Sequence, residues 1–169
     1  DPDDPVGYFG AGFARLAAQH DRPGVDPLAL AAALADSIDH SQVELLPGAD
    51  QILDRARRIG PVGILTNGPR HRQEPKITAL DLADRVDAVV YAADLSRRKP
   101  HTEPFETMLS TLGASAESTL YVGDSLAYDV AGAHNAGLPV AWLRSDGTDR
   151  GSYRPEFTID SLTDLEAIL

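Results

Sequence analysis

Residues 119–125 read Thr-Leu-Tyr-Val-Gly-Asp-Ser, a short apolar run followed at once by a glycine, an aspartate and a serine. Such runs are typical of strands that are covered on both faces, as in parallel sheets. In the residues that follow, Leu126, Val130 and Ala133 recur at helical spacing, and Gly137 marks the end of the predicted helix. The sequence therefore predicts a buried strand, a polar turn and a helix in direct succession.

The same alternation of short strands and helices extends over residues 45–169. Short apolar runs predict the strands, and stretches of helical periodicity or turns separate them. Alternation of this kind is typical of an α/β fold with a doubly wound parallel sheet. We therefore predict an α/β core over residues 45–169. Its predicted strands are residues 62–65, 88–91, 119–122, 140–143 and 157–159.

Residues 1–44 differ from the rest because they carry little strand signal. Phe9 and Phe13 fall on one face of a predicted helix, and Asp26-Pro27 is a typical N-cap and first-turn pair for a second one. Two short helices in succession predict a helical hairpin, which is either a cap or the edge of something larger. The apolar stripe of the second helix consists of Leu30, Ala31, Leu34, Ala35 and Ile38.

The composition indicates a folded, strongly acidic protein. Hydrophobic residues make up 43% of the 169 residues and there is no cysteine, so disulfides, thiolate metal sites and cysteine nucleophiles are excluded. The 26 Asp and Glu against 15 Lys and Arg give a net charge of −11, which repels nucleic-acid backbones and anionic membranes. No apolar run approaches the ~20 residues of a membrane span. We expect a cytoplasmic protein with neither nucleic-acid nor membrane partners.

The kinds of charged residue indicate adaptation to salt. Lys76 and Lys99 are the only lysines, and aspartate outnumbers glutamate by 19 to 7. Abundant short carboxylates with few lysines are typical of proteins from salt-adapted cells, where salt screens the self-repulsion of the surface. A high-GC genome, which also favours arginine and aspartate, is the alternative. We favour the halophilic interpretation because GC bias alone does not explain so large an acidic excess.

Polar residues follow three predicted strands at the edge where parallel sheets bind ligands. Thr66-Asn67-Gly68 follows the first strand, Lys99 lies in the loop after the second, and Gly123-Asp124-Ser125 follows the third. Asp129 comes one helical turn later. Hydroxyl and N–H donors with a lysine suit a phosphoryl group, and aspartates suit Mg²⁺. Singly, each residue could be a helix cap, a turn former or a solvated surface residue, but their joint occurrence at successive strand ends favours ligand binding.

These residues carry a resemblance to the haloacid dehalogenase (HAD) superfamily, in its branch of small-molecule phosphatases with a helical cap. Residues 64–68, Ile-Leu-Thr-Asn-Gly, resemble that family's second motif, in which Thr or Ser and the following residue hold the phosphate. Lys99-Pro100 resembles the third motif, whose lysine offsets the charge of the nucleophile and the phosphoryl group. Residues 121–125, continuing through Asp129, resemble the fourth motif, whose acidic residues hold Mg²⁺. The resemblance covers residues 46–143.

The resemblance implies Mg²⁺-dependent hydrolysis of a small phosphate ester through an aspartyl-phosphate intermediate. The partner would be a small phosphorylated metabolite selected by the cap, and residues 1–44 would be part of that helical cap. The resemblance implies that phosphate is bound by Thr66, Asn67, Gly68 and Lys99. It implies that Lys99, Thr66 and Asp124 take part in catalysis, and that Mg²⁺ is held by Asp124 and Asp129.

Two alternatives to the phosphatase stay open. A 2-haloacid dehalogenase shares the fold and the nucleophile but uses no metal, and it resembles a Ser-rich sequence where this chain has Gly123-Asp124. A non-catalytic α/β module would bind phosphate or a partner without turning anything over. The carboxylate of Asp124 favours the phosphatase over the dehalogenase.

The family's first motif, an apolar strand ending in Asp-x-Asp that supplies the nucleophile, has no match in the chain. Asp1-Pro2-Asp3-Asp4 has a similar spacing, but no strand precedes it. Because the first residue is Asp1 and the only methionine is Met108, we expect the motif to lie upstream of Asp1. By itself, the chain is then expected to be inactive.

The unmatched motif has a structural consequence. In the resembled family its strand lies between the strands of the second and fourth motifs, here residues 62–65 and 119–122. Without it each of these strands has an unpaired inner edge, and each buried backbone group left unsatisfied costs about 1–3 kcal/mol. We therefore predict either a gap or a forced direct pairing between the two strands. A chain in this state should be marginally stable and prone to aggregation.

Overall fold

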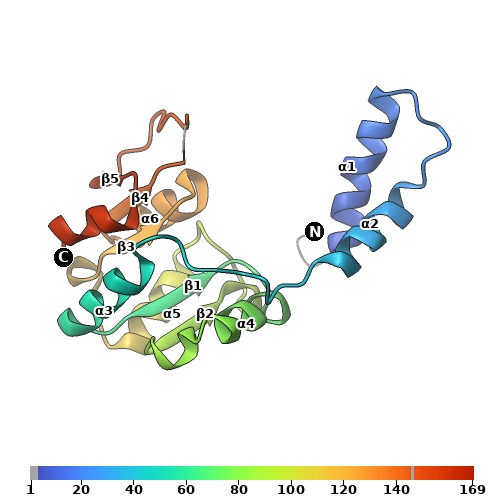
Figure 1. Ribbon diagram of the computed structural model, residues 1–169. Helices are drawn as coiled ribbons and strands as arrows, with labels where there is room; N and C mark the ends of the chain where they lie inside the picture. The colour runs from blue at the N-terminus through green and yellow to red at the C-terminus, as the bar shows by residue number, and fades with distance from the viewer. Residues whose placement is uncertain (1–3, 146) are drawn as a thin grey trace. The chain divides into compact units, whose positions relative to one another are not determined.

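The computed structural model describes residues 4–145 and 147–169, which fall into two compact units (Figure 1). The first unit ends at Gln42, and the second runs from Val43 to Leu169. Residues 1–3, which belong to the Asp-Pro-Asp-Asp sequence, lie outside the described residues. In the described part of the chain, no helix combines the length and the hydrophobicity that crossing a membrane requires.

The first unit contains a helical hairpin of α1 (Pro5–Gln19) and α2 (Pro27–Ser37). Asp26 caps α2 as predicted, because its Oδ1 accepts the N–H of Leu28 at 3.0 Å and that of Ala29 at 3.1 Å. The helices approach closely at the buried Gly10, where an added Cβ would lie 2.7 Å from a methyl group of Leu28. Small residues therefore set the distance between the two helices.

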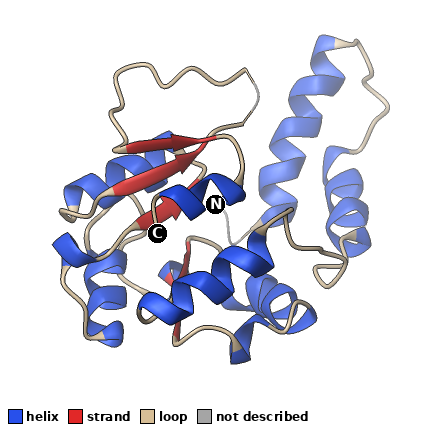
Figure 2. Cartoon of the chain, turned by 60° about the vertical axis from the view of Figure 1, so that its left-hand side comes forward, coloured by secondary structure: helices blue, strands red, loops and turns tan. Residues whose placement is uncertain are grey.

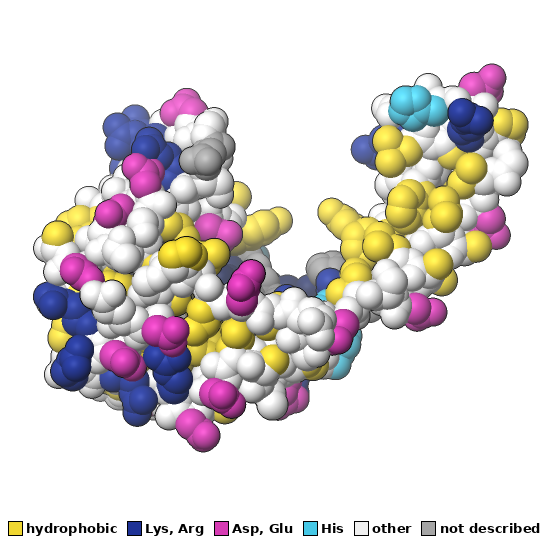
Figure 3. Space-filling model, viewed as in Figure 1, with side chains coloured by type: hydrophobic (Ala, Val, Ile, Leu, Met, Phe, Trp, Pro, Cys, Tyr) yellow, Lys and Arg dark blue, Asp and Glu magenta, His cyan; other side chains and the backbone are white. Residues whose placement is uncertain are grey.

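The apolar stripe predicted for α2 is not buried as a whole. Ala31 is fully buried, whereas Leu30 is 46% and Leu34 36% exposed. A two-helix contact made through small residues buries only a narrow strip, so the larger side chains remain at its margins. Figure 3 shows hydrophobic side chains on the surface of the hairpin.

The second unit alternates helices with short strands, as predicted for residues 45–169. Short helical segments of other types occur between the main elements: η1 (Leu82–Asp84), η2 (Ala92–Asp94), η3 (Ala116–Ser118), the π-helical η4 (Leu126–Val130) and η5 (Leu162–Ala167). The main elements are α3 (Ala49–Ile59), β1 (Gly63–Thr66), α4 (Arg70–Ala79), β2 (Ala88–Tyr91), α5 (Glu103–Leu112), β3 (Tyr121–Gly123), α6 (Ala131–Asn135), β4 (Val140–Leu143) and β5 (Phe157–Ile159).

Among the described residues, the strands form two separate parallel sheets, β1–β2 and β3–β4–β5 (Figure 2). In register, Gly63 of β1 faces Ala88 of β2, and Val122 of β3 faces Ala141 of β4. Within these residues, β1 and β3 are not paired, so each has a strand neighbour on one side only. The predicted separation of these two strands is therefore confirmed, in the form without direct pairing.

The N-terminus of α5 lacks the usual side-chain cap. Thr102 occupies the N-cap position of α5, but its side chain makes no cap hydrogen bond. Its backbone is already helical, with φ −71° and ψ −31°, whereas a capping side chain requires an extended backbone to reach the first-turn N–H groups. In addition, Pro104 in that first turn has no N–H to offer.

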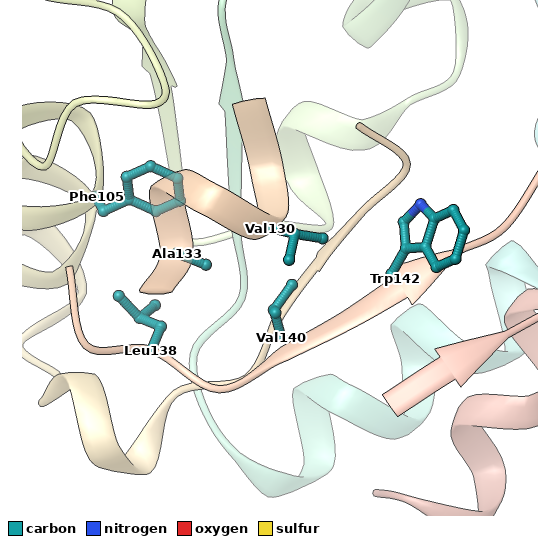
Figure 4. Packing of buried hydrophobic residues seen from close by; sticks show 6 residues of the cluster. All are labelled: Phe105, Val130, Ala133, Leu138, Val140 and Trp142. Atoms are coloured by element: carbon teal, nitrogen blue, oxygen red, sulfur yellow. The ribbon is translucent and has the colours of Figure 1, made fainter. Parts of the chain in front are cut away.

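The buried strand β4 has helices on both of its faces. Side chains alternate between the two faces of a strand. Val140 and Trp142 therefore join one cluster with residues of α5, η4 and α6 (Figure 4), whereas Ala141 joins another with residues of α3 and η5. This arrangement is the predicted doubly wound α/β architecture. The first cluster is Phe105, Val130, Ala133, Leu138, Val140 and Trp142, and the second is Ile52, Ala141, Ile159 and Leu165.

Candidate active site

The side chain of Asn67 holds the backbone of Lys99. Asn67 follows β1, and Lys99 lies in the loop between η2 and α5. The Lys99 N–H donates to Asn67 Oδ1 at 2.9 Å, and Asn67 Nδ2 donates to the Lys99 carbonyl at 3.0 Å. These two bonds tie the loop after β2 to the loop after β1, so two of the predicted site residues come together.

The ammonium group of Lys99 forms a buried ion pair with Asp129. Its Nζ lies 2.6 Å from Asp129 Oδ1, and the two side chains are only 9% and 7% exposed. Opposite charges are buried in proteins when they are paired and hydrogen-bonded, because an isolated buried charge is strongly destabilising. Neither residue is therefore an ordinary solvated surface residue.

Tyr121 is a member of this cluster that sequence reasoning missed. Its hydroxyl accepts a hydrogen bond from Lys99 Nζ at 2.9 Å and donates one to Asp129 Oδ1 at 3.0 Å. Burial, reinforced by the negative charge of Asp129, raises the pKa of Tyr121 well above its ordinary value. In the sequence, Tyr121 is part of the apolar run that predicts a strand, so its hydroxyl does not stand out. The one available signal was that a buried tyrosine hydroxyl needs a hydrogen-bond partner.

A π-helical turn presents Asp129 to this cluster. The N–H groups of Asp129 and Val130 both donate to the Ser125 carbonyl, at 2.8 Å and 3.1 Å. In return, the Ser125 N–H donates to Asp129 Oδ2 at 2.9 Å. The turn therefore fixes one carboxylate oxygen and leaves the other for Lys99 and Tyr121. Turns of this rare type are frequent at functional sites.

Gly123 lies directly against Asp129. A Cβ added to Gly123 would be 2.5 Å from both Cβ and Cγ of Asp129, far inside the ~3.5–4 Å at which carbon atoms normally pack. Glycine is therefore required here because the strand end and the aspartate side chain approach so closely.

Asp124 occupies the exposed side of the same loop. Its carbonyl oxygen accepts a hydrogen bond from Trp142 Nε1 at 2.9 Å, which fastens the loop to β4. No hydrogen bond or ion pair with residues 4–145 or 147–169 involves its carboxylate. The two predicted metal ligands therefore differ: the Asp124 carboxylate has no partner among the described residues, whereas the Asp129 carboxylate is buried and hydrogen-bonded.

The residues present fit a Mg²⁺ ion that takes only part of its coordination from this chain. Magnesium is commonly bound through one or two carboxylates together with water and substrate phosphate oxygens. Asp124 offers such a carboxylate, whereas both oxygens of Asp129 already accept hydrogen bonds. Within the described residues, no group of three or more His, Cys, Asp or Glu side chains could hold a metal ion.

The loop after β1 is shaped by Thr66. Its Oγ1 accepts the Gly68 N–H at 3.1 Å, which is a local turn of the kind that threonine often makes. The Gly68 N–H, which the motif assigned to phosphate, is therefore engaged inside the chain. The Thr66 hydroxyl can still donate to a ligand, because accepting a hydrogen bond does not use its own hydrogen.

Comparison with known proteins places these residues in a family context. The sequence model described as haloacid dehalogenase-like hydrolase matches residues 15–143, which is more than half of the chain. Pyrophosphatase PpaX of Bacillus cereus (strain AH820) is 36% identical over 111 residues, which cover 64% of this chain and 51% of PpaX. Pyrimidine 5'-nucleotidase YjjG of Escherichia coli (strain K12) is 32% identical over 126 residues, which cover 73% of this chain and 56% of YjjG.

A solved structure extends the likeness to the fold of the whole chain. The HAD-hydrolase YfnB of Bacillus subtilis, determined bound to magnesium, superposes with a TM-score of 0.74 and 23% identity. The match covers 100% of this chain and 82% of YfnB. By contrast, the chain spans about half the length of the curated relatives that it matches.

Proposed function

Because the chain belongs to the haloacid dehalogenase-like hydrolase family, we propose that it forms the phosphate-binding and cation-binding side of a phosphatase active site. The observation that carries the proposal is the buried Lys99–Asp129 ion pair beside the ends of β1 and β3. The names of two relatives, a pyrophosphatase and a pyrimidine 5'-nucleotidase, support a small phosphorylated substrate. A cationic side chain that is held rigidly and shielded from water is well suited to stabilise a phosphoryl group in transfer.

Each proposed role follows from a side chain of the site. The Thr66 hydroxyl donates to a phosphoryl oxygen, and Lys99 Nζ offsets negative charge on the nucleophile and the phosphate. Asn67 acts indirectly, because it holds the Lys99 backbone in place. Asp124 holds Mg²⁺, which when bound would neutralise phosphoryl charge, and Asp129 orients Lys99.

The phosphoryl-accepting nucleophile is proposed to be an aspartate outside these 169 residues. Among the described residues, no strand ends in Asp-x-Asp, and β1 and β3 each have a neighbour on one side only. Attack by such an aspartate on phosphorus would expel the alcohol or phosphate leaving group. Water would then hydrolyse the resulting aspartyl-phosphate and regenerate the carboxylate.

Turnover of p-nitrophenyl phosphate by the full-length protein with Mg²⁺ tests this function, and the two lysines supply matched variants. Lys99→Met should lower kcat by about 100-fold or more, since it removes a preorganised charge from the site. Lys76→Met should change kcat by less than about 2-fold, because Lys76 lies at the end of α4, outside the site. Asp124→Asn should raise the Mg²⁺ concentration needed for half-maximal activity.

Two results would contradict the proposal. Full turnover in the Lys99→Met protein, with its fold verified by circular dichroism, would remove Lys99 from the reaction. Chloride release from a 2-haloacid in the presence of EDTA would identify a dehalogenase instead.

A further inference from the structure

Every N–H of the Lys99 ammonium group has an acceptor within the described residues. An ammonium group carries three donors. They meet Asp129 Oδ1 at 2.6 Å, Tyr121 Oη at 2.9 Å and the Leu65 carbonyl oxygen at 3.3 Å. For Lys99 to bind a ligand oxygen, one of these three bonds must therefore be exchanged.

The three bonds are unequal. The bond to Asp129 is charge-assisted on both sides, and such bonds are roughly twice as strong as neutral ones. The bond to Leu65 is the longest and ends on a neutral carbonyl of β1, next to Thr66. An anionic phosphoryl oxygen arriving beside Thr66 would be the better acceptor. The Leu65 bond is therefore the one that a ligand replaces.

Tyr121 determines which donor of Lys99 is free to be exchanged. Its single hydroxyl accepts from Lys99 and donates to Asp129, so the three groups close a hydrogen-bonded triangle. The Phe105 ring packs edge-on against the Tyr121 ring, with 5.0 Å between centroids, and helps to hold it. Tyr121 thereby occupies a second donor of the ammonium group and limits its rotation about the Cε–Nζ bond.

We propose that Tyr121 is a positioning residue of this site, whose hydroxyl aims Lys99 so that the N–H now bonded to the Leu65 carbonyl is the one presented to a phosphoryl oxygen. This role rests on the proposed function only in that the ligand of Lys99 is taken to be a phosphoryl oxygen. Neither the family match nor the motif residues assign a role to Tyr121.

Lysine NMR tests the proposal without any turnover. With ¹⁵N-lysine, the chain has two side-chain ammonium signals, of which Lys76 is an internal control. Tyr121→Phe removes the hydroxyl and keeps the ring. Tyr128→Phe removes a hydroxyl from an exposed residue of η4 and is the matched control. We expect Tyr121→Phe to accelerate hydrogen exchange of the Lys99 ammonium group by about 3-fold or more and to weaken inorganic phosphate binding several-fold, with Tyr128→Phe unchanged in both.

A measurement on the unaltered chain covers the case in which the Tyr121→Phe protein does not fold. On titration with inorganic phosphate, the ¹³C signal of the Leu65 carbonyl should shift, since its hydrogen bond is lost, whereas the ¹³Cζ signal of Tyr121 should not. Equal shifts of both signals would overturn the proposal, as would a Lys99 signal and phosphate affinity that are unaffected in folded Tyr121→Phe protein.

Kinetics in the full-length protein separate positioning from binding. Tyr121→Phe should lower kcat by about 5- to 20-fold and raise KM by a smaller factor, because a misdirected ammonium group stabilises the transition state even less well than it binds the phosphoryl group of the substrate. A rise in KM at constant kcat would overturn the positioning role. If the full-length protein lacks phosphatase activity while the NMR changes occur as expected, the proposed function fails and the positioning role stands.

Discussion

Gly123 and Asp129 show how closely residues approach one another in this site. The backbone at the end of β3 touches the Asp129 side chain, and that side chain is held by Lys99, Tyr121 and Ser125. Because Asp129 is held on all these sides, it cannot move away from an added methyl group without breaking its own hydrogen bonds. The glycine thus fixes the distance between the strand and the π-helical turn.

We expect Gly123→Ala to lower the free energy of unfolding by about 1–3 kcal/mol, since overpacking a tightly held site forces backbone or side-chain shifts. Gly60→Ala is the matched control. Gly60 has extended backbone, and apart from its own residue and its two chain neighbours no heavy atom of the described residues lies within 4 Å of its added Cβ. This change should therefore raise stability by about 0.4–1 kcal/mol. Urea unfolding of both variants measures the difference. A Gly123→Ala protein as stable as Gly60→Ala would show that the contact relaxes freely.

At the residue scale, the sequence predicted which residues meet but not how they are bonded. Asn67, Lys99 and Asp129 lie together as their places after the strands suggested. Asn67 binds the backbone of Lys99, and the Gly68 N–H binds Thr66. Both contacts depend on loop conformations that hydrophobic patterns in a sequence do not predict. Tyr121 was missed for a related reason, because hydrophobic periodicity shows that a side chain is buried but not what its hydroxyl contacts.

At the scale of elements, one carboxylate joins α6, β4 and the segment before β5. Glu156 Oε2 accepts the Val140 N–H at 2.8 Å and lies 3.1 Å from His134 Nε2. Burial acts to raise the pKa of Glu156, but the hydrogen bonds from the Val140 N–H and His134 together hold it below its usual value of 4.5. The ionised form is therefore favoured by the folded state.

This shift gives the stability a pH dependence of known sign. A carboxyl group whose pKa is lower in the folded than in the unfolded state stabilises the fold at pH values above its unfolded-state pKa. That contribution is lost as the pH falls below about 4.5. Wild type should exceed Glu156→Gln in stability at pH 7, by less than about 1 kcal/mol because the side chain is 44% exposed. The difference should shrink as the pH falls below about 4.5. A difference that is constant from pH 7 to pH 3, measured by chemical denaturation, would rule out this origin.

Most elements of the second unit were predictable because their signals are local. Short apolar runs and helical spacing depend on neighbouring residues, and the predicted strands 88–91, 140–143 and 157–159 match β2, β4 and β5. The burial of α2 was not predictable in the same way. The apolar residues of α2 are spaced as predicted, but how far they are buried depends on the partner helix. Because α1 contacts α2 through the small residue Gly10, only a narrow strip of α2 is covered.

At the scale of the whole molecule, the dominant property is negative charge. With 26 acidic against 15 basic residues, the folded chain repels itself. Several arginines are nevertheless paired, among them Arg85 with Asp54 at 3.2 Å and Arg144 with Asp160 at 2.7 Å. The excess charge thus consists of acidic groups that outnumber their possible partners.

If the acidic surface reflects adaptation to salt, as we propose, the melting temperature should rise when KCl is increased from ~0.1 M to ~1 M. Over that range the Debye length shrinks from about 10 Å to about 3 Å, and repulsion between surface carboxylates is screened. A comparison with equal ionic strengths of NaCl controls for specific cation effects. A flat or falling melting temperature in both salts would favour genome composition as the cause of the acidic excess.

Trp142 is the only tryptophan of the 169 residues, and its indole N–H is bonded to the Asp124 carbonyl. Tryptophan emission from the whole chain therefore comes from a single ring that is attached to the candidate cation-binding loop. The ring itself is 1% exposed, so bulk quenchers do not reach it while the chain is folded. The chain thus contains its own fluorescent probe, whose intensity and wavelength follow the state of one loop without any added label.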